Sequence, residues 1–225
     1  MNSERLVFAG DIHGSDAELY QLLKFFGGLR HIIFLGDYVN RGPRSKEVIN
    51  CLIGATELWP QHVTLLRGNH DQAFLDFMRG ADPAHFVRLG GLTTARSYVG
   101  QYGIDTMGEL RRTVPDTHID FLENLEDYFE RDDVFASHCG LDPKHPTART
   151  RHSVSSASHP ELFSFSPLEH IGKTVICGHY IQRNGRPYIS EGLMAIDTGC
   201  GAIPGAPLTA LLWPERTVIQ FRGAR

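Results

Sequence analysis

Three short polar segments, each directly after an apolar run, carry side chains that could bind metal ions and phosphate. They read Gly-Asp-Ile-His-Gly at 10–14, Gly-Asp-Tyr-Val-Asn-Arg-Gly at 36–42 and Arg-Gly-Asn-His-Asp at 67–71. A carboxylate at the end of a strand can bridge two cations, and a nearby arginine can bind a phosphoryl group through two hydrogen bonds. One such segment alone is more often a turn held by a salt bridge, so the hypothesis depends on all three occurring together.

The apolar runs before these segments predict β-strands, and the stretches between them predict α-helices. The runs are short, apolar and partly β-branched, which is typical of buried strands. They are residues 6–9, 31–35 and 62–66. One helix is expected from a capping box at 15–18 to Gly27, and another from 45 to 59, before Pro60. This alternation predicts a parallel sheet with all three polar segments at one edge.

The second half of the chain predicts more strands after a helical insertion. The insertion is expected at about 72–127, within a single domain of residues 1–225, and it either shapes substrate access or only covers the core. A long loop with one helical turn is expected at 142–170. Further strands are expected at 134–137, 174–177, 193–196, 208–212 and 217–221. About eight or nine strands in all predict an α/β fold with two packed sheets and outer helices.

The composition of the 225 residues is typical of a globular chain, with 41% hydrophobic and 21% charged residues. The formal net charge of −4 argues against general nucleic-acid binding. Four widely spaced cysteines without a C-x-x-C pair indicate reduced thiols. Residues 1–5 contain no apolar stretch, and no apolar run approaches about 18 residues. We therefore expect a cytoplasmic protein with neither a signal peptide nor a membrane span.

Two histidines in the second half, His138 and His179, also follow predicted strands and complete a candidate metal-binding set. The candidate ligands are Asp11, His13, Asp37, Asn69, His138 and His179. Oxygen and imidazole ligands without a thiolate suit manganese, iron or zinc. We expect two divalent ions, Mn²⁺ before iron or zinc, that clamp the oxygens of a displacement at phosphorus and lower the pKa of a water molecule. His70 could protonate the leaving group, and Arg41 could neutralise phosphoryl oxygens.

The motifs together resemble those of a known enzyme family. The three segments above resemble the signatures of the phosphoprotein phosphatase family of calcineurin-like metallophosphoesterases. Ser137-His138-Cys139-Gly140 and Gly178-His179 match its two later histidine motifs, and Asp197-Thr198-Gly199 matches the strand end that follows them. The match keeps the family's order from residue 5 to about 213. The resemblance implies a four-layer α/β/β/α sandwich.

The resemblance also implies which ion each candidate ligand holds. Asp11 and His13 are expected to hold the first ion, and Asp37 is expected to bridge the two ions. The other three candidates are expected to hold the second ion.

The remaining motif residues are expected to act on the substrate or to support the site. By resemblance, His70 is the general acid, Arg41 binds phosphate and Asn40 orients the acid histidine. Asp197 is expected to support the fold or the ligands without binding metal, and Cys139 is expected to pack as a small apolar residue.

Details of the motifs indicate two classes of substrate. The small size and the segment Gly90-Gly91-Leu92-Thr93-Thr94 look like bacterial and phage-lambda-type serine/threonine phosphatases, which implies a phosphorylated protein or peptide. The family usually carries Asp in place of Asn40 and Glu in place of Asp71. Both departures are similar to bis(5′-nucleosyl)-tetraphosphatases, which implies a dinucleoside polyphosphate.

Two further alternatives concern a missing arginine and a loss of activity. Lambda-type enzymes carry a phosphate-binding Arg near residues 162–166, and this chain lacks it there. Arg149, Arg151 or Arg183 could replace it, although each is typical of a solvated loop. Some relatives keep the sandwich only as a binding scaffold after losing ligands, but all six ligand types are present here.

Overall fold

The computed structural model describes residues 5–223 of the chain. Residues 1–4, on which much of the signal-peptide expectation rests, lie outside the described residues. The strands are β1 Leu6–Ala9, β2 His31–Phe34, β3 Val63–Leu65, β4 Phe129–Glu130, β5 Val134–Ser137, β6 Thr174–Cys177, β7 Tyr188–Ile189, β8 Leu193–Ala195, β9 Leu208–Trp213 and β10 Thr217–Phe221. The helices are α1 Asp16–Phe26, α2 Ser45–Leu58, α3 Asn69–Met78, α4 Pro83–Arg88, α5 Gly91–Val99, α6 Thr106–Thr113, α7 Asp116–Glu123, η1 His152–Ser156, η2 Pro160–Ser164 and α8 Pro167–Ile171.

The strands form two five-stranded sheets, with orders β10-β9-β1-β2-β3 and β4-β5-β6-β8-β7. The pairs β1–β2 and β2–β3 are parallel, as predicted from the alternation of strands and helices. The antiparallel strand β9 pairs with β1 and makes the first sheet mixed. Two edge strands, β4 and β7, were not predicted, because two residues are too few to show a period in the sequence.

Alternation along the strands creates the layers of the molecule. In β1, Leu6 and Phe8 face the second sheet, whereas Val7 and Ala9 face the helices α1 and α2. In the same way, Ile176 of β6 lies between the sheets, and its neighbours in the chain pack on the outer face of the second sheet. Three apolar cores therefore separate four layers.

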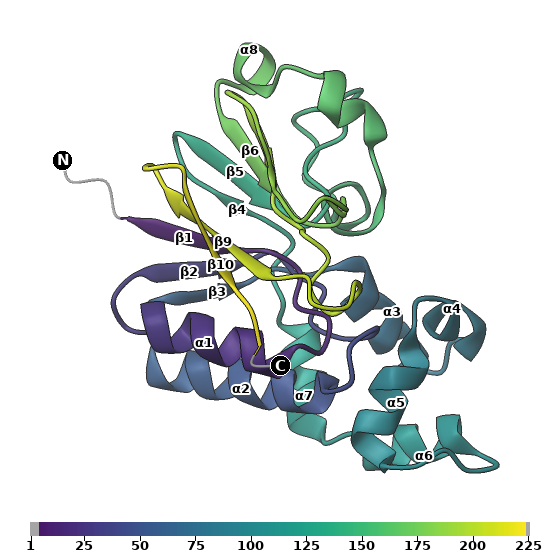
Figure 1. The fold of residues 1–225 in the computed structure, drawn as a ribbon. Helices are drawn as coiled ribbons and strands as arrows, with labels where there is room; N and C mark the ends of the chain where they lie inside the picture. The colour runs from purple at the N-terminus through teal and green to yellow at the C-terminus, as the bar shows by residue number, and fades with distance from the viewer. Residues whose placement is uncertain (1–4, 224–225) are drawn as a thin grey trace.

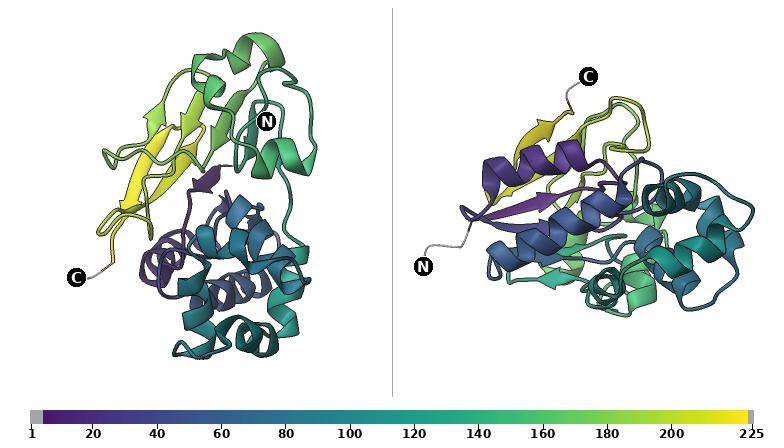
Figure 2. Two further views of the ribbon diagram at one scale, coloured as in Figure 1. Left: turned by 90° about the vertical axis from the view of Figure 1, so that its right-hand side faces the viewer. Right: turned by 90° about the horizontal axis from the view of Figure 1, so that it is seen from below.

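Figure 1 shows these layers, with α1 and α2 below the first sheet and α8 above the second. Figure 2 shows the same arrangement from two other sides, with the helices α3–α7 gathered beside the first sheet. The predicted α/β sandwich of two sheets with outer helices is confirmed.

Two local predictions were wrong. The predicted capping box is absent: Ser15 makes no side-chain hydrogen bond with the backbone of α1, and Glu18 accepts a hydrogen bond of 2.8 Å from the backbone N–H of Gly223. The segment 142–170 contains η1, η2 and α8 rather than a single turn. These short helices form because Val154 and Leu162 are fully buried against the outer face of the second sheet.

Arg67, in the third polar segment, joins the sheet to the helical region. Its side chain is fully buried. It donates hydrogen bonds of 2.7 Å to the carbonyl of Leu122 and of 3.0 Å to the carbonyls of Glu123 and Leu125, at the C-terminal end of α7. A cation there also interacts favourably with the helix dipole. The loop that leads into Asn69 is thereby fixed against α7.

We expect Arg67→Met to lower the free energy of unfolding by about 3–5 kcal/mol, because three carbonyls, two of them in buried hydrogen bonds, lose a charged donor. Urea denaturation of the metal-free protein measures this loss. Arg79→Met is the matched control, since Arg79 is exposed and pairs with Glu123 at 2.8 Å on the surface. That change should cost at most about 1 kcal/mol. Equal losses in the two variants would contradict the role of Arg67.

Candidate metal centre

The ends of five strands bring the predicted site residues together, and strained backbone marks the place. His13, Asp37, Asn40, Arg41 and His179 all have positive φ, between 45° and 71°. Non-glycine residues adopt this left-handed region only at a cost, and such residues concentrate at functional sites.

Glycines beside the carboxylates allow the close packing of these strand ends. A Cβ atom at Gly68 would overlap the Asp37 carboxylate, and one at Gly178 would overlap that of Asp11. Gly68 and Gly178 precede the candidate ligands Asn69 and His179, so the two motifs need glycine at these positions.

The first group of candidate ligands consists of Asp11, His13 and Asp37. Nδ1 of His13 lies 2.9 Å from the carbonyl of Val39, which can only accept, so Nδ1 carries the proton. The lone pair of Nε2 therefore faces Asp37 Oδ2 at 3.5 Å and Asp11 Oδ2 at 3.8 Å. This nitrogen is buried and has no hydrogen-bond partner among the described residues. A lone pair that faces two carboxylates fits a cation between them.

The second group consists of Asn69, His138 and His179. Nδ1 of His138 donates to the carbonyl of Leu35 at 2.9 Å, which again leaves the lone pair on Nε2. That Nε2 lies 3.0 Å from Asn69 Oδ1, 3.3 Å from His179 Nδ1 and 3.5 Å from Asp37 Oδ1. Asn69 Oδ1 also lies 3.0 Å from His179 Nδ1. Asp37 thus presents one oxygen to each group, as a bridging carboxylate would.

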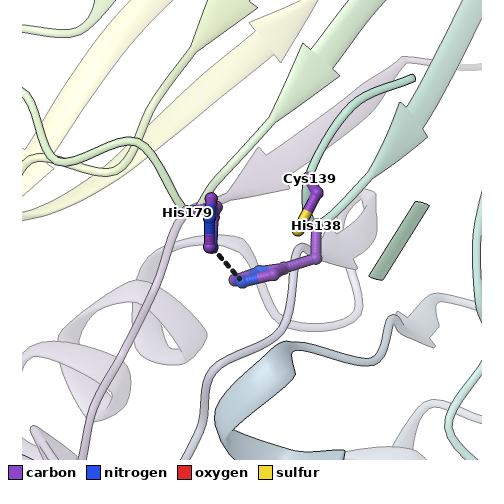
Figure 3. Close-up of side chains that lie close together, drawn as sticks. All are labelled: His138, Cys139 and His179. Carbon is purple, nitrogen blue, oxygen red and sulfur yellow. Dashed lines mark hydrogen bonds between the residues drawn. The ribbon is translucent and has the colours of Figure 1, made fainter. Parts of the chain in front are cut away.

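Figure 3 shows the rings of His138 and His179 close together, with the Cys139 sulfur beside them. The three side chains could together hold an ion, since their ligand atoms lie within 4.8 Å of one another. However, burial raises the pKa of the Cys139 thiol well above its usual value. The thiolate form that binds metal is therefore disfavoured, in line with an apolar packing role.

Burial makes the charged forms of the candidate carboxylate ligands unfavourable unless cations are present. Burial raises the pKa of Asp37 to about 6, and burial with the charges of Asp197 and Asp37 raises that of Asp11. Burial likewise lowers the pKa of His138 to about 3 and that of His179 to about 4, so both imidazoles are neutral at pH 7. The protein supplies little positive charge to the carboxylates. Divalent ions, as expected from the sequence, fit this donor set.

Asn40, Thr94 and His70 form a hydrogen-bonded chain that fixes the state of His70. The hydroxyl of Thr94 in α5 donates to Asn40 Oδ1 at 2.8 Å, so the Asn40 amide points its NH₂ group at His70 Nδ1, 3.0 Å away. Nδ1 accepts, and the proton of the neutral ring lies on Nε2. Burial, Arg41 and His85 lower the pKa of His70 to about 3, which keeps the ring neutral at pH 7.

The protonated Nε2 makes His70 a hydrogen-bond donor rather than a metal ligand, although it lies only 3.7 Å from Asp37 Oδ2. Arg41 Nη2 lies 3.2 Å from the same nitrogen. Both nitrogens carry a hydrogen atom, so neither can accept a hydrogen bond from the other. A phosphoryl oxygen between them could accept from both.

Sequence reasoning missed the contribution of Asp71, whose only sequence signal was its departure from the usual Glu. The buried carboxylate accepts hydrogen bonds from three backbone N–H groups: Gly68 at 3.0 Å, Asp37 at 2.8 Å and Tyr38 at 2.9 Å. It therefore holds two of the polar segments in register. Burial and the charge of Asp37 raise its pKa to about 7 against these hydrogen bonds.

The three candidate replacements for the missing phosphate-binding arginine differ in position. Arg149 pairs with Glu130 at 3.1 Å and covers the ring of Phe135 at 4.1 Å, so it is engaged in packing. Arg151 pairs with Asp127 at 2.9 Å and also lines a groove beside Asn69. Arg183 is exposed.

The groove beside Asn69 has a volume of about 490 Å³. Its walls come from α3, α4 and the segment around η1, and include Gln72, Asp76, His85 and Arg151. Apart from the imidazole rings, its described lining contains no aromatic side chain, so its character is polar.

Comparison with known proteins identifies the family. A model of the calcineurin-like phosphoesterase family matches residues 4–182, which is 179 of the 225 residues. The chain therefore belongs to this family of metallophosphoesterases, and the resemblance seen in its motifs is confirmed. Members hydrolyse phosphate esters and use divalent metal ions, so the chain is assigned as a metal-binding hydrolase of this class.

Solved structures share the fold at low sequence identity. A provisionally assigned diadenosine tetraphosphatase has a TM-score of 0.69 and 21% identity, with 100% of this chain and 96% of that chain covered. A serine/threonine phosphatase from Saccharomyces cerevisiae with similarity to human phosphatase PP5 has a TM-score of 0.64 and 16% identity, with 99% and 81% covered. A cold-active protein-tyrosine phosphatase of a Shewanella species has a TM-score of 0.58 and 19% identity, with 97% and 80% covered.

Among the described residues, none of the helices has both the length and the apolar character that crossing a bilayer requires.

We expect Asp37→Asn and His138→Ala to reduce turnover by more than about 100-fold, beyond the loss typical of residues that only surround a metal. Elemental analysis should find fewer than two bound ions per chain, with an unchanged circular dichroism spectrum. Asp132→Asn, on an exposed turn, is the control. Near-normal turnover of either variant at saturating Mn²⁺ would refute the assignment.

Proposed function

We propose that this protein is a dinuclear metal-dependent phosphatase that acts on phosphorylated serine or threonine in proteins. The observation that carries the metal site is the pair of buried imidazole lone pairs, on His13 and His138, that face the two oxygens of Asp37. In this proposal Asp11, His13 and Asp37 hold the first ion, and Asp37 also reaches the second. Asn69, His138 and His179 complete the second set.

The residues around the ions have separate tasks. The two ions, when bound, supply an activated water and neutralise charge on the phosphoryl group. Arg41 donates two hydrogen bonds to phosphoryl oxygens and orients the phosphorus for in-line attack. His70 transfers a proton to the leaving oxygen only from its imidazolium form, as the phosphorus–oxygen bond breaks and the ring becomes neutral. The neutral ring carries its one proton on Nε2 and donates a hydrogen bond from it to the leaving oxygen. Asn40 keeps that proton on Nε2 by donating to Nδ1.

The polar groove beside Asn69 supports a peptide substrate. A nucleobase is held mainly by stacking on aromatic or apolar surfaces, and the described lining of this groove offers few. Amide and charged side chains such as Gln72 and Asp76 suit the polar backbone and side chains of an extended phosphopeptide.

A dinucleoside polyphosphate is the second candidate, and Asn40 favours it. Burial, Arg41 and His85 lower the pKa of His70, and the neutral amide of Asn40 offers no negative charge to oppose them, so little imidazolium is available to act as an acid at pH 7. A phosphate leaving group needs little acid assistance, whereas a serine alkoxide needs much.

A substrate panel with added Mn²⁺ tests the proposal. It compares a phosphoserine peptide, diadenosine tetraphosphate and an aryl phosphate by kcat/KM. The leading proposal expects the phosphopeptide to exceed diadenosine tetraphosphate. The reverse order would establish the second candidate, and activity on none of the three would overturn both.

We expect Arg41→Ala to lower kcat/KM by about 10²–10³-fold, as the loss of one charged transition-state donor does. Arg151→Ala should cost less, since Arg151 lines the groove but is paired with Asp127. Arg149→Ala serves as the control for a packed arginine. A loss in Arg151→Ala that equals the loss in Arg41→Ala would make Arg151 the second phosphate-binding residue.

We expect Asn40→Asp to raise turnover of a phosphoserine peptide more than that of an aryl phosphate, and to raise turnover of a polyphosphate least. A carboxylate would accept from His70 Nδ1 and stabilise the imidazolium, which is the stronger proton donor. General acid assistance is worth about 10²–10⁴-fold when the leaving group is poor. Thr94 can still donate to the new side chain. Equal gains on all three substrates, or no gain, would contradict a role of position 40 in tuning the acid.

A further inference from the structure

The helices α1 and α2, which lie side by side under the first sheet (Figure 1), enclose an apolar groove. This α1–α2 groove lies between residues 20–27 and 50–59 and has a volume of about 370 Å³. Its walls are mostly apolar and include Leu23, Leu58 and Trp59. Small-molecule sites have volumes of about 300–1,000 Å³ and mainly apolar walls. The groove therefore has the size and character of a site for a small ligand.

Large apolar side chains of the groove remain exposed to solvent. Tyr20 is 63% exposed and Leu58 is 71% exposed, although their neighbour in the lining, Leu23, is buried. Exposed apolar side chains that gather around a depression are typical of a binding surface.

The groove also contains a glycine that packing within the chain does not explain. Gly54 lies inside α2, where glycine destabilises a helix by about 0.5–1 kcal/mol relative to alanine. A Cβ atom at this position would meet no heavy atom within 4 Å. A ligand that lies against the backbone of α2 would account for the missing side chain.

Two polar groups in the groove offer hydrogen-bond donors that have no partner among residues 5–223. Lys24 forms neither an ion pair nor a hydrogen bond with these residues. Asn50 Oδ1 accepts a hydrogen bond of 2.9 Å from His118 Nε2, and His118 Nδ1 accepts one of 2.7 Å from the hydroxyl of Tyr98. The Asn50 amide is thereby oriented, and its NH₂ group stays free. A cation and an amide donor together suit a carboxylate.

We propose that the α1–α2 groove binds a small carboxylate with an elongated apolar body, of the class of a free medium-chain fatty acid. The carboxylate accepts from Lys24 and Asn50, and the alkyl chain lies over Gly54 toward Leu58 and Trp59. Asn50 and Leu58 are eight residues apart in α2, which is about 12 Å along the helix axis, so an extended chain can run between them. None of these residues belongs to the candidate metal centre, so this site is independent of the proposed phosphatase activity.

Fluorescence titration with decanoate tests the proposal. Trp59 lines the groove and is one of two tryptophans in the chain, so Trp213→Phe leaves Trp59 as the reporter. Decanoate, kept below the concentration at which it forms micelles, should change this fluorescence in a saturable manner. Decan-1-ol has the same chain length without the charge and should bind about 10-fold more weakly.

Substitutions separate the charge from the space. Lys24→Met should weaken binding of decanoate by about 10-fold and leave that of decan-1-ol unchanged, whereas Lys144→Met, at an exposed position, should match the unsubstituted protein. Asn50→Asp keeps an acceptor for His118 but replaces the donor by a negative charge, so it should also weaken binding of decanoate. Gly54→Leu fills the groove and should abolish binding of both probes.

The outcomes that would overturn the proposal are specific. Equal affinity for decanoate and decan-1-ol, or an unchanged affinity in Lys24→Met, would contradict recognition of a carboxylate. Saturable binding that persists in a folded Gly54→Leu variant would contradict the location. If the variants do not fold, NMR of the wild-type protein decides the location, since decanoate should shift the backbone amide resonances of α1 and α2. Shifts confined to other elements, or no saturable shift, would refute the site.

Discussion

The burial of carboxylates opposite imidazole lone pairs is the constraint on which the rest of this structure depends. Asp37 faces His13 and His138 without a protein cation between them, and burial alone shifts the pKa of each group toward its neutral form. Such an arrangement is unfavourable in an apo protein and favourable around divalent ions. The backbone must therefore hold these side chains together although burying the carboxylates without a cation is unfavourable.

Asp71 provides much of that restraint. Its carboxylate accepts hydrogen bonds from the backbone N–H groups of Gly68, Asp37 and Tyr38. These bonds link the loop after β2 to the start of α3. These hydrogen bonds offset part of the cost of the left-handed backbone at Asp37.

The sequence predicted the strand ends well because each buried strand is a short apolar run followed by charged residues. It therefore identified Asp11, Asp37 and Asn69 as neighbours at one sheet edge, and the structure brings them together. It could not predict that one buried oxygen of Asp197 has no hydrogen-bond partner among the described residues, since partners are set by packing between segments far apart in the chain. For the same reason it assigned Glu18 to a capping box, whereas the carboxylate bonds to Gly223.

The helical region α3–α7 does more than cover the core, which was one of the two interpretations open from the sequence. Thr94 of α5 orients the amide of Asn40, and that amide sets the proton on His70. Arg67 fixes the end of α7 to the loop before Asn69. A shift of these helices would therefore change the tautomer of His70 and the position of a candidate ligand together. His70 and the groove residues Gln72 and Asp76 all belong to α3, so the acid and one wall of the groove share one helix.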